Sequence, residues 1–316
     1  MHTFWREQMS INWFPGHMHK ATKAIRQLLP KMDLIVEILD ARMPFSSSNP
    51  VIQQFHTDLP RLKLLNKADL ADDRQTEAWL HHFGQCDHLK SIKMSALAAG
   101  LAEKLPKIMH QCIKSTQKVG GAQVLITGIP NVGKSTIINQ MLGRTIAKTG
   151  NQPAVTRDLQ KIQLSDEITL WDSPGILWPK VLNPKSGLRL AATGAIKDTA
   201  ISHDEVALFS LDYLLNHYTD RLQARYQVNT ALNSVEVMEQ IGLQRGCLGK
   251  GGQVDFDKVA KLILQDLRSG QLGRVTLETP IMQEQEMEEA AQMALKKAQE
   301  KAAKKAARKK AFKKRH

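Results

Sequence analysis

The stretch that decides the fold occupies residues 128–135 and reads Gly128-Ile129-Pro130-Asn131-Val132-Gly133-Lys134-Ser135. It matches the pattern G-x-x-x-x-G-K-S, in which the glycines let successive backbone N–H groups turn toward phosphate oxygens. The apolar residues 124–127 before it are typical of a buried parallel strand, and residues 135–142 after it place their apolar side chains on one helical face. A phosphate-binding loop requires this order of strand, loop and helix, because the helix N-terminus also attracts anions.

The residue types of the loop predict separate roles in binding a nucleotide. Lys134 should reach the β- and γ-phosphates, and the Ser135 hydroxyl should ligate Mg²⁺. A glycine-rich turn that binds nothing is the alternative, and the strand and helix on either side argue against it. Together with the downstream motifs, the expected phosphate contacts are Gly128, Asn131, Val132, Gly133, Lys134, Ser135, Thr136, Thr156 and Gly175.

Two downstream segments complete the expected phosphate and metal site. A second apolar strand ends in Asp172-Ser173-Pro174-Gly175, which places a carboxylate at a strand end near the loop. Asp172 suits a position that meets Mg²⁺ through water, and the Gly175 N–H can meet the γ-phosphate. The polar residues 150–157 have the composition of a switch loop, in which Thr156 is a further candidate Mg²⁺ ligand.

A second motif is suited to reading the base of the nucleotide. A short apolar strand ends in Asn66-Lys67-Ala68-Asp69, and the Asp69 carboxylate can accept hydrogen bonds from guanine N1–H and N2–H. Adenine lacks both donors, so this carboxylate selects guanine nucleotides. Asn66 should support the loop and the N7 edge, and the Lys67 stem should cover the ring face. After another strand, the backbone N–H groups around Ser95 and Ala96 can meet guanine O6.

The order of the two motifs predicts the fold. In an ordinary GTPase the guanine motif follows the phosphate loop, whereas here residues 66–69 precede residues 128–135. The sequence therefore predicts an α/β fold with a circularly permuted P-loop GTPase domain, in which a mostly parallel sheet has helices on both faces.

Other segments extend this pattern: Trp13-Phe14-Pro15-Gly16-His17-Met18, Asp40-Ala41-Arg42-Met43-Pro44, Asp172-Ser173-Pro174-Gly175-Ile176-Leu177-Trp178, and Arg245-Gly246-Cys247 with Gly251, Gly252 and Asp255. With them, residues 10–280 resemble the circularly permuted GTPases and, within that group, the ribosome biogenesis GTPase A family. The resemblance implies a GTP-hydrolysing factor that docks on a maturing large ribosomal subunit, made of 23S rRNA and ribosomal proteins, and leaves after hydrolysis.

Three positions bear on the mechanism of hydrolysis. Ile176 stands where many GTPases carry a Gln that orients water, so intrinsic turnover should be slow, on the order of 10⁻⁴ to 10⁻² s⁻¹. The resemblance nominates His17 as the catalytic residue, and the alternative is that His17 is one of 11 histidines with only solvent or local contacts. It also implies that Asn131 helps to hold K⁺ beside the phosphates, and the alternative is an Asn that suits a tight turn.

Beyond residue 180 the pattern changes from alternating strands and helices to successive helical runs, such as residues 206–217 and 256–267. The glycine cluster at 246–252 has no strand before it, which favours a turn between helices over a second phosphate site. We therefore expect a GTPase domain over residues 1–180, a smaller α-helical domain over residues 181–282 and a basic tail over residues 283–316.

Charge predicts the class of partner. Residues 296–316 contain 11 Lys or Arg against Glu300 alone, which gives a net charge of +10 out of +13 for the chain. This Ala- and Lys-rich tail should be largely unfolded when free and should bind RNA through its phosphates, with steep salt dependence. A solubilising tail is the alternative. Charges scattered through the helical region are expected to be ordinary solvated ones, namely Arg189, Lys197, Arg221, Arg225 and Arg245.

The remaining features concern location and cofactors. Nothing in the sequence resembles a membrane span or a signal peptide, and Cys86, Cys112 and Cys247 lack the spacing of a metal site or a disulfide framework. We expect a cytoplasmic protein with no membrane or DNA partner, and with GTP or GDP, Mg²⁺ and K⁺ as cofactors. The functional alternatives are a non-catalytic RNA-binding placeholder that uses GTP as a structural ligand, and a GTPase that acts on tRNA or the small subunit.

Overall fold

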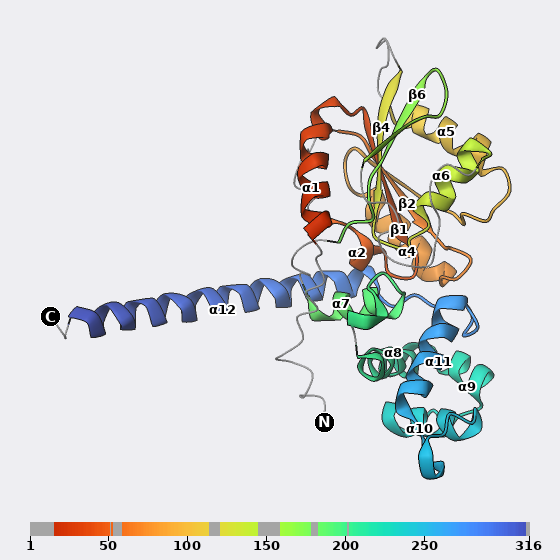
Figure 1. Cartoon of the computed structure of the whole chain (residues 1–316), viewed down its shortest axis with the longest axis vertical. Helices are drawn as coiled ribbons and strands as arrows, with labels where there is room; N and C mark the ends of the chain where they lie inside the picture. The colour runs from red at the N-terminus through yellow and green to blue at the C-terminus, as the bar shows by residue number, and fades with distance from the viewer. Residues whose placement is uncertain are drawn as a thin grey trace.

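The computed structural model describes residues 16–50, 52, 59–113, 121–144, 159–177, 183–200 and 202–313. In Figure 1, a sheet with flanking helices stands above a cluster of helices, and a long C-terminal helix leaves from the boundary between them. This order of elements confirms the predicted permuted α/β domain followed by helices.

In the part of the chain that the structure describes, six strands form one sheet in the order β3-β2-β1-β4-β6-β5. Every neighbouring pair is parallel except β5 with β6. The strands are β1 (Leu34–Asp40), β2 (Arg61–Asn66), β3 (Leu89–Lys93), β4 (Ala122–Gly128), β5 (Gln160–Gln163) and β6 (Ile168–Asp172). The central strands β1 and β4 are buried along almost their whole length and are accordingly rich in Ile, Leu and Val. Their pairing joins the half of the sheet that carries the guanine motif to the half that carries the phosphate loop.

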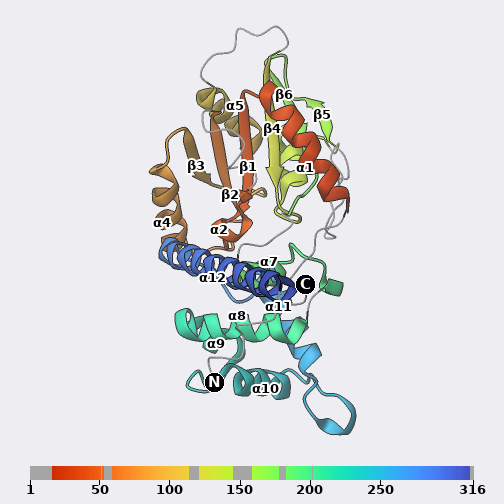
Figure 2. The same ribbon diagram turned by 90° about the vertical axis from the view of Figure 1, so that its left-hand side faces the viewer.

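Helices cover both faces of this sheet. α1 (Gly16–Leu28) lies on one face, and α5 (Leu101–Cys112) and α6 (Lys134–Leu142) lie on the other (Figures 1 and 2). The short 3₁₀ helix η1 (Leu29–Lys31) joins α1 to the strand β1. Among the described residues, α2 (Pro44–Ser47) follows β1, and α4 (Asp73–Gly84) packs beside β3.

The helical part agrees with the predicted pattern. Its elements are α7 (Pro184–Ala192), η2 (Asp198–Ala200), α8 (His203–His217), α9 (Thr219–Tyr226), α10 (Ser234–Gln244), η3 (Lys250–Gly252) and α11 (Phe256–Ser269). The two helical runs expected from the sequence lie in α8 and α11, which pack against each other. Residues 246–252 lie between α10 and α11 and include a turn next to an isolated bridge between Leu248 and Val254, so the prediction of a turn between helices is confirmed.

A buried charge cluster ties the helical part to the C-terminal helix. Arg189 of α7 is only 1% exposed. Its guanidinium donates to both carboxylate oxygens of Glu286, at 2.6 and 2.9 Å, and lies 3.3 Å from the Glu278 carboxylate. The prediction of a solvated charge at Arg189 is therefore wrong. No local pattern could reveal this, because Glu286 lies 97 residues further along the chain.

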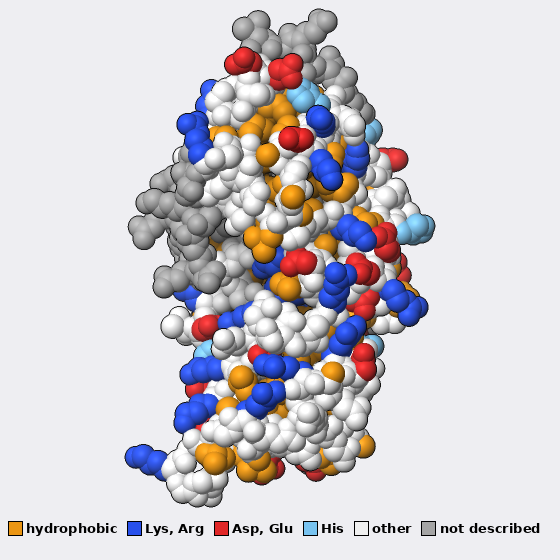
Figure 3. Space-filling view, turned by 90° about the vertical axis from the view of Figure 1, so that its right-hand side faces the viewer, with side chains coloured by type: hydrophobic (Ala, Val, Ile, Leu, Met, Phe, Trp, Pro, Cys, Tyr) orange, Lys and Arg blue, Asp and Glu red, His pale blue; other side chains and the backbone are white. Residues whose placement is uncertain are grey.

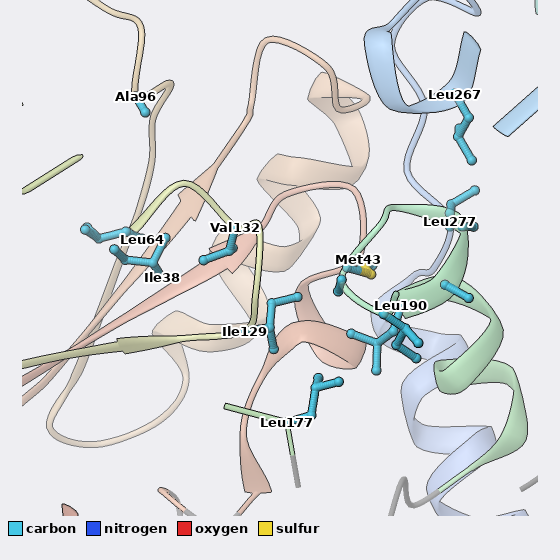
Figure 4. Packing of buried hydrophobic residues seen from close by; sticks show 14 of the residues in the cluster. Ile38, Met43, Leu64, Ala96, Ile129, Val132, Leu177, Leu190, Leu267 and Leu277 are labelled. Carbon is cyan, nitrogen blue, oxygen red and sulfur yellow. The ribbon is translucent and has the colours of Figure 1, made fainter. Parts of the chain in front are cut away.

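Apolar side chains fill the boundary between the sheet and the helical part. Met43 after β1, Leu190 of α7 and Leu277 before the last helix are fully buried there, as Figure 4 shows. Ile129 and Val132 of the phosphate loop belong to the same apolar cluster. The core that supports the phosphate loop is therefore continuous with the core that joins it to the helices.

The last helix, α12 (Pro280–Lys313), starts against the body and then extends away from it (Figures 1 and 2). The chain is helical here to Lys313, which differs from the unfolded tail expected from the composition. That residues 283–316 are largely unfolded when free stays a prediction, as do the domain boundaries at residues 180 and 282. Among the helices of the described residues, none has the length and continuous apolar stretch needed to cross a bilayer.

Candidate nucleotide-binding site

The expected site residues meet at the carboxyl edge of the sheet. Four neighbouring parallel strands, β2, β1, β4 and β6, end in Asn66, Asp40, Gly128 and Asp172. The register aligns these ends, since Asp40 pairs with Asn66, Ile38 with Gly128, and Ile126 with Asp172. Ligands of open α/β sheets bind at this edge, next to the point where the strand order reverses. The two motifs that are 62 residues apart in sequence, counted from Asn66 to Gly128, therefore form one site.

The phosphate loop has a backbone that only particular residues allow. Gly133 has φ of +96°, and a Cβ there would stand 2.3 Å from the Asn66 side-chain nitrogen. A Cβ at Gly128 would lie 2.7 Å from the Ile38 carbonyl oxygen. Asn131 also has a positive φ, +58°, which Asn tolerates better than most residues. Both glycines are thus needed for close approach, and the loop delivers Lys134 as the first residue of α6.

Asn66 connects the guanine motif to two other segments. Its side-chain amide donates to the Val132 carbonyl oxygen at 2.7 Å, and its carbonyl oxygen accepts from the Ala96 N–H at 2.8 Å. Asn66 is 1% exposed. The prediction that Asn66 supports the loop agrees with these bonds, although the Ala96 N–H expected at guanine O6 is here donated to Asn66. The nucleotide contacts of Ser95 and Ala96 stay predictions.

The next two polar residues of the motif, Lys67 and Asp69, differ in exposure, because Lys67 is half-buried and Asp69 is exposed. Lys67 adopts a positive φ of +60°. Its ammonium donates to the Asn131 carbonyl oxygen at 2.8 Å and to the Asp40 carboxylate at 3.1 Å. Burial is the largest cause that lowers the pKa of Lys67, and Asp40 opposes it. Asp69 is exposed, so its carboxylate is accessible to a base, as a guanine reader must be.

On the phosphate side, two buried charges face each other. The Lys134 ammonium donates to one carboxylate oxygen of Asp172, and their side chains are 6% and 0% exposed. Burial raises the pKa of Asp172, against the opposing effect of Lys134. The second oxygen of Asp172 is buried and has no hydrogen-bond partner among the described residues. A buried acceptor without a partner is costly, which is the condition expected of a group that meets a further ligand.

These residues fit a bound Mg²⁺. The unpartnered Asp172 oxygen and the hydroxyl of Ser135, which is half-buried at the start of α6, supply the oxygen donors that Mg²⁺ prefers. Gly175 packs against the phosphate loop, because a Cβ there would stand 3.0 Å from the Pro130 backbone. The next N–H, of Ile176, donates to the Gly128 carbonyl oxygen at 3.2 Å.

Some expected residues lie elsewhere or outside the description. Ile176 is 2% exposed and belongs to the apolar core, in keeping with the view that it does not orient water. Thr156 lies outside the described residues, and so does the side chain of His17, although α1 begins at Gly16. Sequence reasoning missed Asp40 as part of this edge. Its position at the end of an apolar strand was a usable signal.

Comparison with known proteins agrees with this geometry. A family described as "50S ribosome-binding GTPase" matches residues 123–240. The "Ribosome biogenesis GTPase A" of Bacillus cereus is 44% identical over 284 residues, which cover 86% of this chain and 95% of that relative. The chain belongs to the ribosome biogenesis GTPase A family. A member from Thermotoga maritima is 29% identical over 283 residues, covering 87% of this chain and 98% of that relative.

Solved structures of the ribosome biogenesis GTPase A family agree with the fold. The GNP-bound YlqF from T. maritima has a TM-score of 0.59 and 25% identity, covering 83% of this chain and 98% of that chain. A GDP-bound YlqF structure has the same TM-score and identity, with coverage of 81% and 99%. Family membership confirms the permuted GTPase fold and identifies the chain as a GTPase of ribosome biogenesis, and such a family implies guanine nucleotide binding.

Proposed function

We propose that this chain is a GTP-binding and GTP-hydrolysing assembly factor that docks on the immature large (50S) ribosomal subunit and is released after hydrolysis stimulated by that subunit. The observation that carries the proposal is the Asn66 bridge, which joins the guanine motif to the phosphate loop and to Ala96 at one edge of the sheet. The relatives named for ribosome biogenesis supply the biological setting.

The described side chains divide the work of binding. Asp69 accepts hydrogen bonds from guanine. Lys134 exchanges its Asp172 partner for the β- and γ-phosphates, and the N–H groups at the start of α6 face the phosphates.

Bound Mg²⁺ would neutralise phosphate charge, with Ser135, Thr156 and, through water, Asp172 as its ligands. Asn131 would contribute to a K⁺ site, and Gly175 would contact the γ-phosphate.

Hydrolysis needs a side chain that orients the attacking water, and the expected position for it carries Ile176. Since Ile176 is an aliphatic side chain in the core, it cannot hold the attacking water, and turnover by the isolated protein should be slow. We assign the missing role to His17, brought toward the γ-phosphate when the ribosomal subunit is bound. A neutral imidazole near physiological pH can accept a hydrogen bond from water.

The tail supplies the main charged surface for a partner. It carries a net charge of +10 over residues 296–316, from 11 Lys or Arg and one Glu. On the body, by contrast, Lys and Arg side chains lie among Asp and Glu over both the sheet and the helical part in the face shown in Figure 3. The tail therefore favours the phosphates of 23S rRNA, with ribosomal proteins as further contacts. The setting of the reaction is the cytoplasm, with no membrane or DNA partner.

The test is GTP hydrolysis by the full chain in potassium buffer, with and without large ribosomal subunits, and with small subunits and sodium buffer as controls. We expect at least a tenfold increase in rate with large subunits alone. Particle binding without stimulated phosphate release would replace the proposal with an RNA-binding placeholder, and stimulation by small subunits or tRNA would replace it with a GTPase of those substrates.

The role of His17 has its own matched control. His17→Ala should leave GTP binding intact and remove most of the stimulated rate, whereas His19→Ala, which changes an exposed histidine two residues later, should keep that rate. Full stimulated activity in His17→Ala would contradict the catalytic assignment.

A further inference from the structure

A buried carboxylate at the end of β1 is bonded to the lysine of the guanine motif. Asp40, at the end of β1, is 1% exposed. One of its oxygens accepts from Arg42 Nε at 2.9 Å, and the other accepts from Arg42 Nη2 at 2.8 Å and Lys67 Nζ at 3.1 Å. Burial alone would raise the pKa of Asp40, yet the two cations hold it well below its usual range. Asp40 is therefore a charged bridge between Arg42 and the lysine of the guanine motif.

Arg42 continues this bridge into the helical part. Its Nη1 donates to the Leu267 carbonyl oxygen at 3.1 Å, in the last turn of α11. Helix C-termini present carbonyl groups without intrahelical partners, and a cation there is favourable. The Arg42 carbonyl oxygen accepts from the Leu277 N–H at 2.7 Å. Arg42, two residues after β1, is thus bonded both to the last turn of α11 and to the segment that leads from α11 to α12.

The other end of the bridge is the phosphate loop. Lys67 donates to the Asn131 carbonyl oxygen at 2.8 Å. The Asn131 side chain in turn donates to the Gly194 carbonyl oxygen at 2.8 Å, just after α7. Gly194 lies beside Arg268, whose guanidinium bonds the Ala192 carbonyl oxygen at 3.0 Å. Asn131 is therefore bonded to the guanine motif through its backbone and to the helical part through its side chain.

We infer that Asp40 and Arg42 are positioning residues that couple the helical domain to nucleotide affinity. Arg42 fixes Asp40 against α11, Asp40 places the Lys67 ammonium, and Lys67 places the Asn131 carbonyl in the phosphate loop. A movement of α11 would alter the loop that holds the phosphates, and nucleotide binding would by linkage alter the contacts of α11. The inference rests on the nucleotide binding in the proposed function and not on docking to any particle.

The alternative is that the Asp40–Arg42 pair only stabilises the fold. A purely structural pair lowers the melting temperature when it is changed, but it leaves the affinity of the folded protein for GDP unchanged. The deciding quantity is thus the dissociation constant for a fluorescent GDP analogue, measured on full-length variants that circular dichroism shows to be folded.

Two variants and one control separate coupling to nucleotide affinity from a purely structural role. In Asp40→Asn the carboxylate that holds Lys67 becomes neutral, and we expect GDP to bind about 10-fold more weakly, within the range of measured coupling between sites. Arg42→Lys keeps the charge but cannot bond Asp40 and the α11 carbonyl together, and we expect about a 5-fold loss. Arg274→Gln removes an exposed ion pair with Asp73, between the helical part and α4, and should leave GDP affinity unchanged.

Folded Asp40→Asn and Arg42→Lys proteins with GDP affinities within twofold of the parent would overturn the coupling. If neither variant folds, the parent decides: GDP should slow amide exchange in residues 264–270 of α11 and its C-terminus, and unchanged exchange there would overturn the inference. A parent that binds no GDP removes the proposed function as well. If the parent binds GDP normally but shows no ribosome-stimulated hydrolysis, the proposed function is contradicted and the inference is not.

Discussion

The guanine side and the phosphate side of this site differ in how their side chains are held. On the guanine side, the Asn66 amide donates to the Val132 carbonyl oxygen and accepts from the Ala96 N–H, so both ends of this side chain have partners within the protein. On the phosphate side, Lys134 bonds Asp172, whose other oxygen has no partner among the described residues. The guanine side therefore has its geometry before a base arrives, whereas the phosphate side holds two charges that must change partners when phosphates bind.

The pKa values of the buried carboxylates on the two sides also shift in opposite directions. Burial opposes the ionised form of both Asp40 and Asp172. Arg42 and Lys67 overcome this effect at Asp40, so its pKa is lowered, whereas Lys134 does not overcome it at Asp172, so the pKa of that carboxyl is raised. A carboxylate in a preformed scaffold is fully paired, and a carboxylate in a site that awaits a cation is not.

The largest effect should come from removing the lysine of the phosphate side. Lys134→Ala deletes the cation that meets the phosphates, so we expect GTP affinity to fall by more than about 100-fold, measured by calorimetry. The variant also leaves Asp172 buried without its partner, and breaking such a pair lowers the free energy of unfolding by about 3–5 kcal/mol. Lys107→Ala, at an exposed position of α5, is the control and should bind GTP normally. Tight GTP binding by Lys134→Ala would show that the loop is not the phosphate site.

Next in size is the base reader, which is exposed and so contributes recognition without stability. Asp69→Asn should weaken GDP binding about 100-fold, since two hydrogen bonds to a charged acceptor are lost or inverted. Its free energy of unfolding without nucleotide should stay within about 0.5 kcal/mol of the parent. Asp87→Asn, also exposed, should change neither quantity. Unaltered guanine preference in Asp69→Asn would remove this residue from the site.

A smaller effect should follow from the preformed bridge itself. Asn66→Ala leaves a loop carbonyl and a buried N–H without their partner, and we expect a loss of about 1–3 kcal/mol in the free energy of unfolding without nucleotide, measured in urea. Asn216→Ala, which changes an exposed asparagine of α8, is the control and should show no such loss. If Asn66→Ala were as stable as the parent, the guanine side would not be preformed in the sense argued above.

The smallest effect is a difference in pH dependence. The pKa of Asp40 is lowered in the folded protein, so its stabilising contribution is present above about pH 4 and is lost as the pH falls below that value. Asp40→Asn should therefore flatten the decline in unfolding free energy between pH 5 and pH 3, by at most about 1.4 kcal/mol per pH unit. The pKa of Asp172 is raised, which has the opposite sign, so Asp172→Asn should steepen the decline. Equal slopes in both variants would contradict the difference between the two sides.

The sequence predicted the parts of this site that depend on local spacing. The phosphate loop, the guanine motif and Asp172 each follow an apolar run, and because parallel strands end at one edge, their convergence could be expected. The fold class followed from the inverted order of two motifs.

Contacts between distant segments could not be predicted in this way. Arg42 and Leu267 are 225 residues apart, and Asn131 and Gly194 are 63 apart. Nothing in the residues around Arg189 distinguishes it from a solvated arginine, and its burial depends on carboxylates brought in by the last helix. These contacts arise from how the helical part packs on the sheet, which neither periodicity nor a motif specifies.

The central claim, that the guanine side is preformed and the phosphate side is not, is tested most directly by amide hydrogen exchange of the full chain with and without GDP and Mg²⁺. We predict that residues 128–136 and 172–177 gain strong protection on binding, whereas residues 64–66 are already protected in the free protein and change little. Strong protection appearing mainly at residues 64–66, with the phosphate loop already protected without nucleotide, would contradict the account.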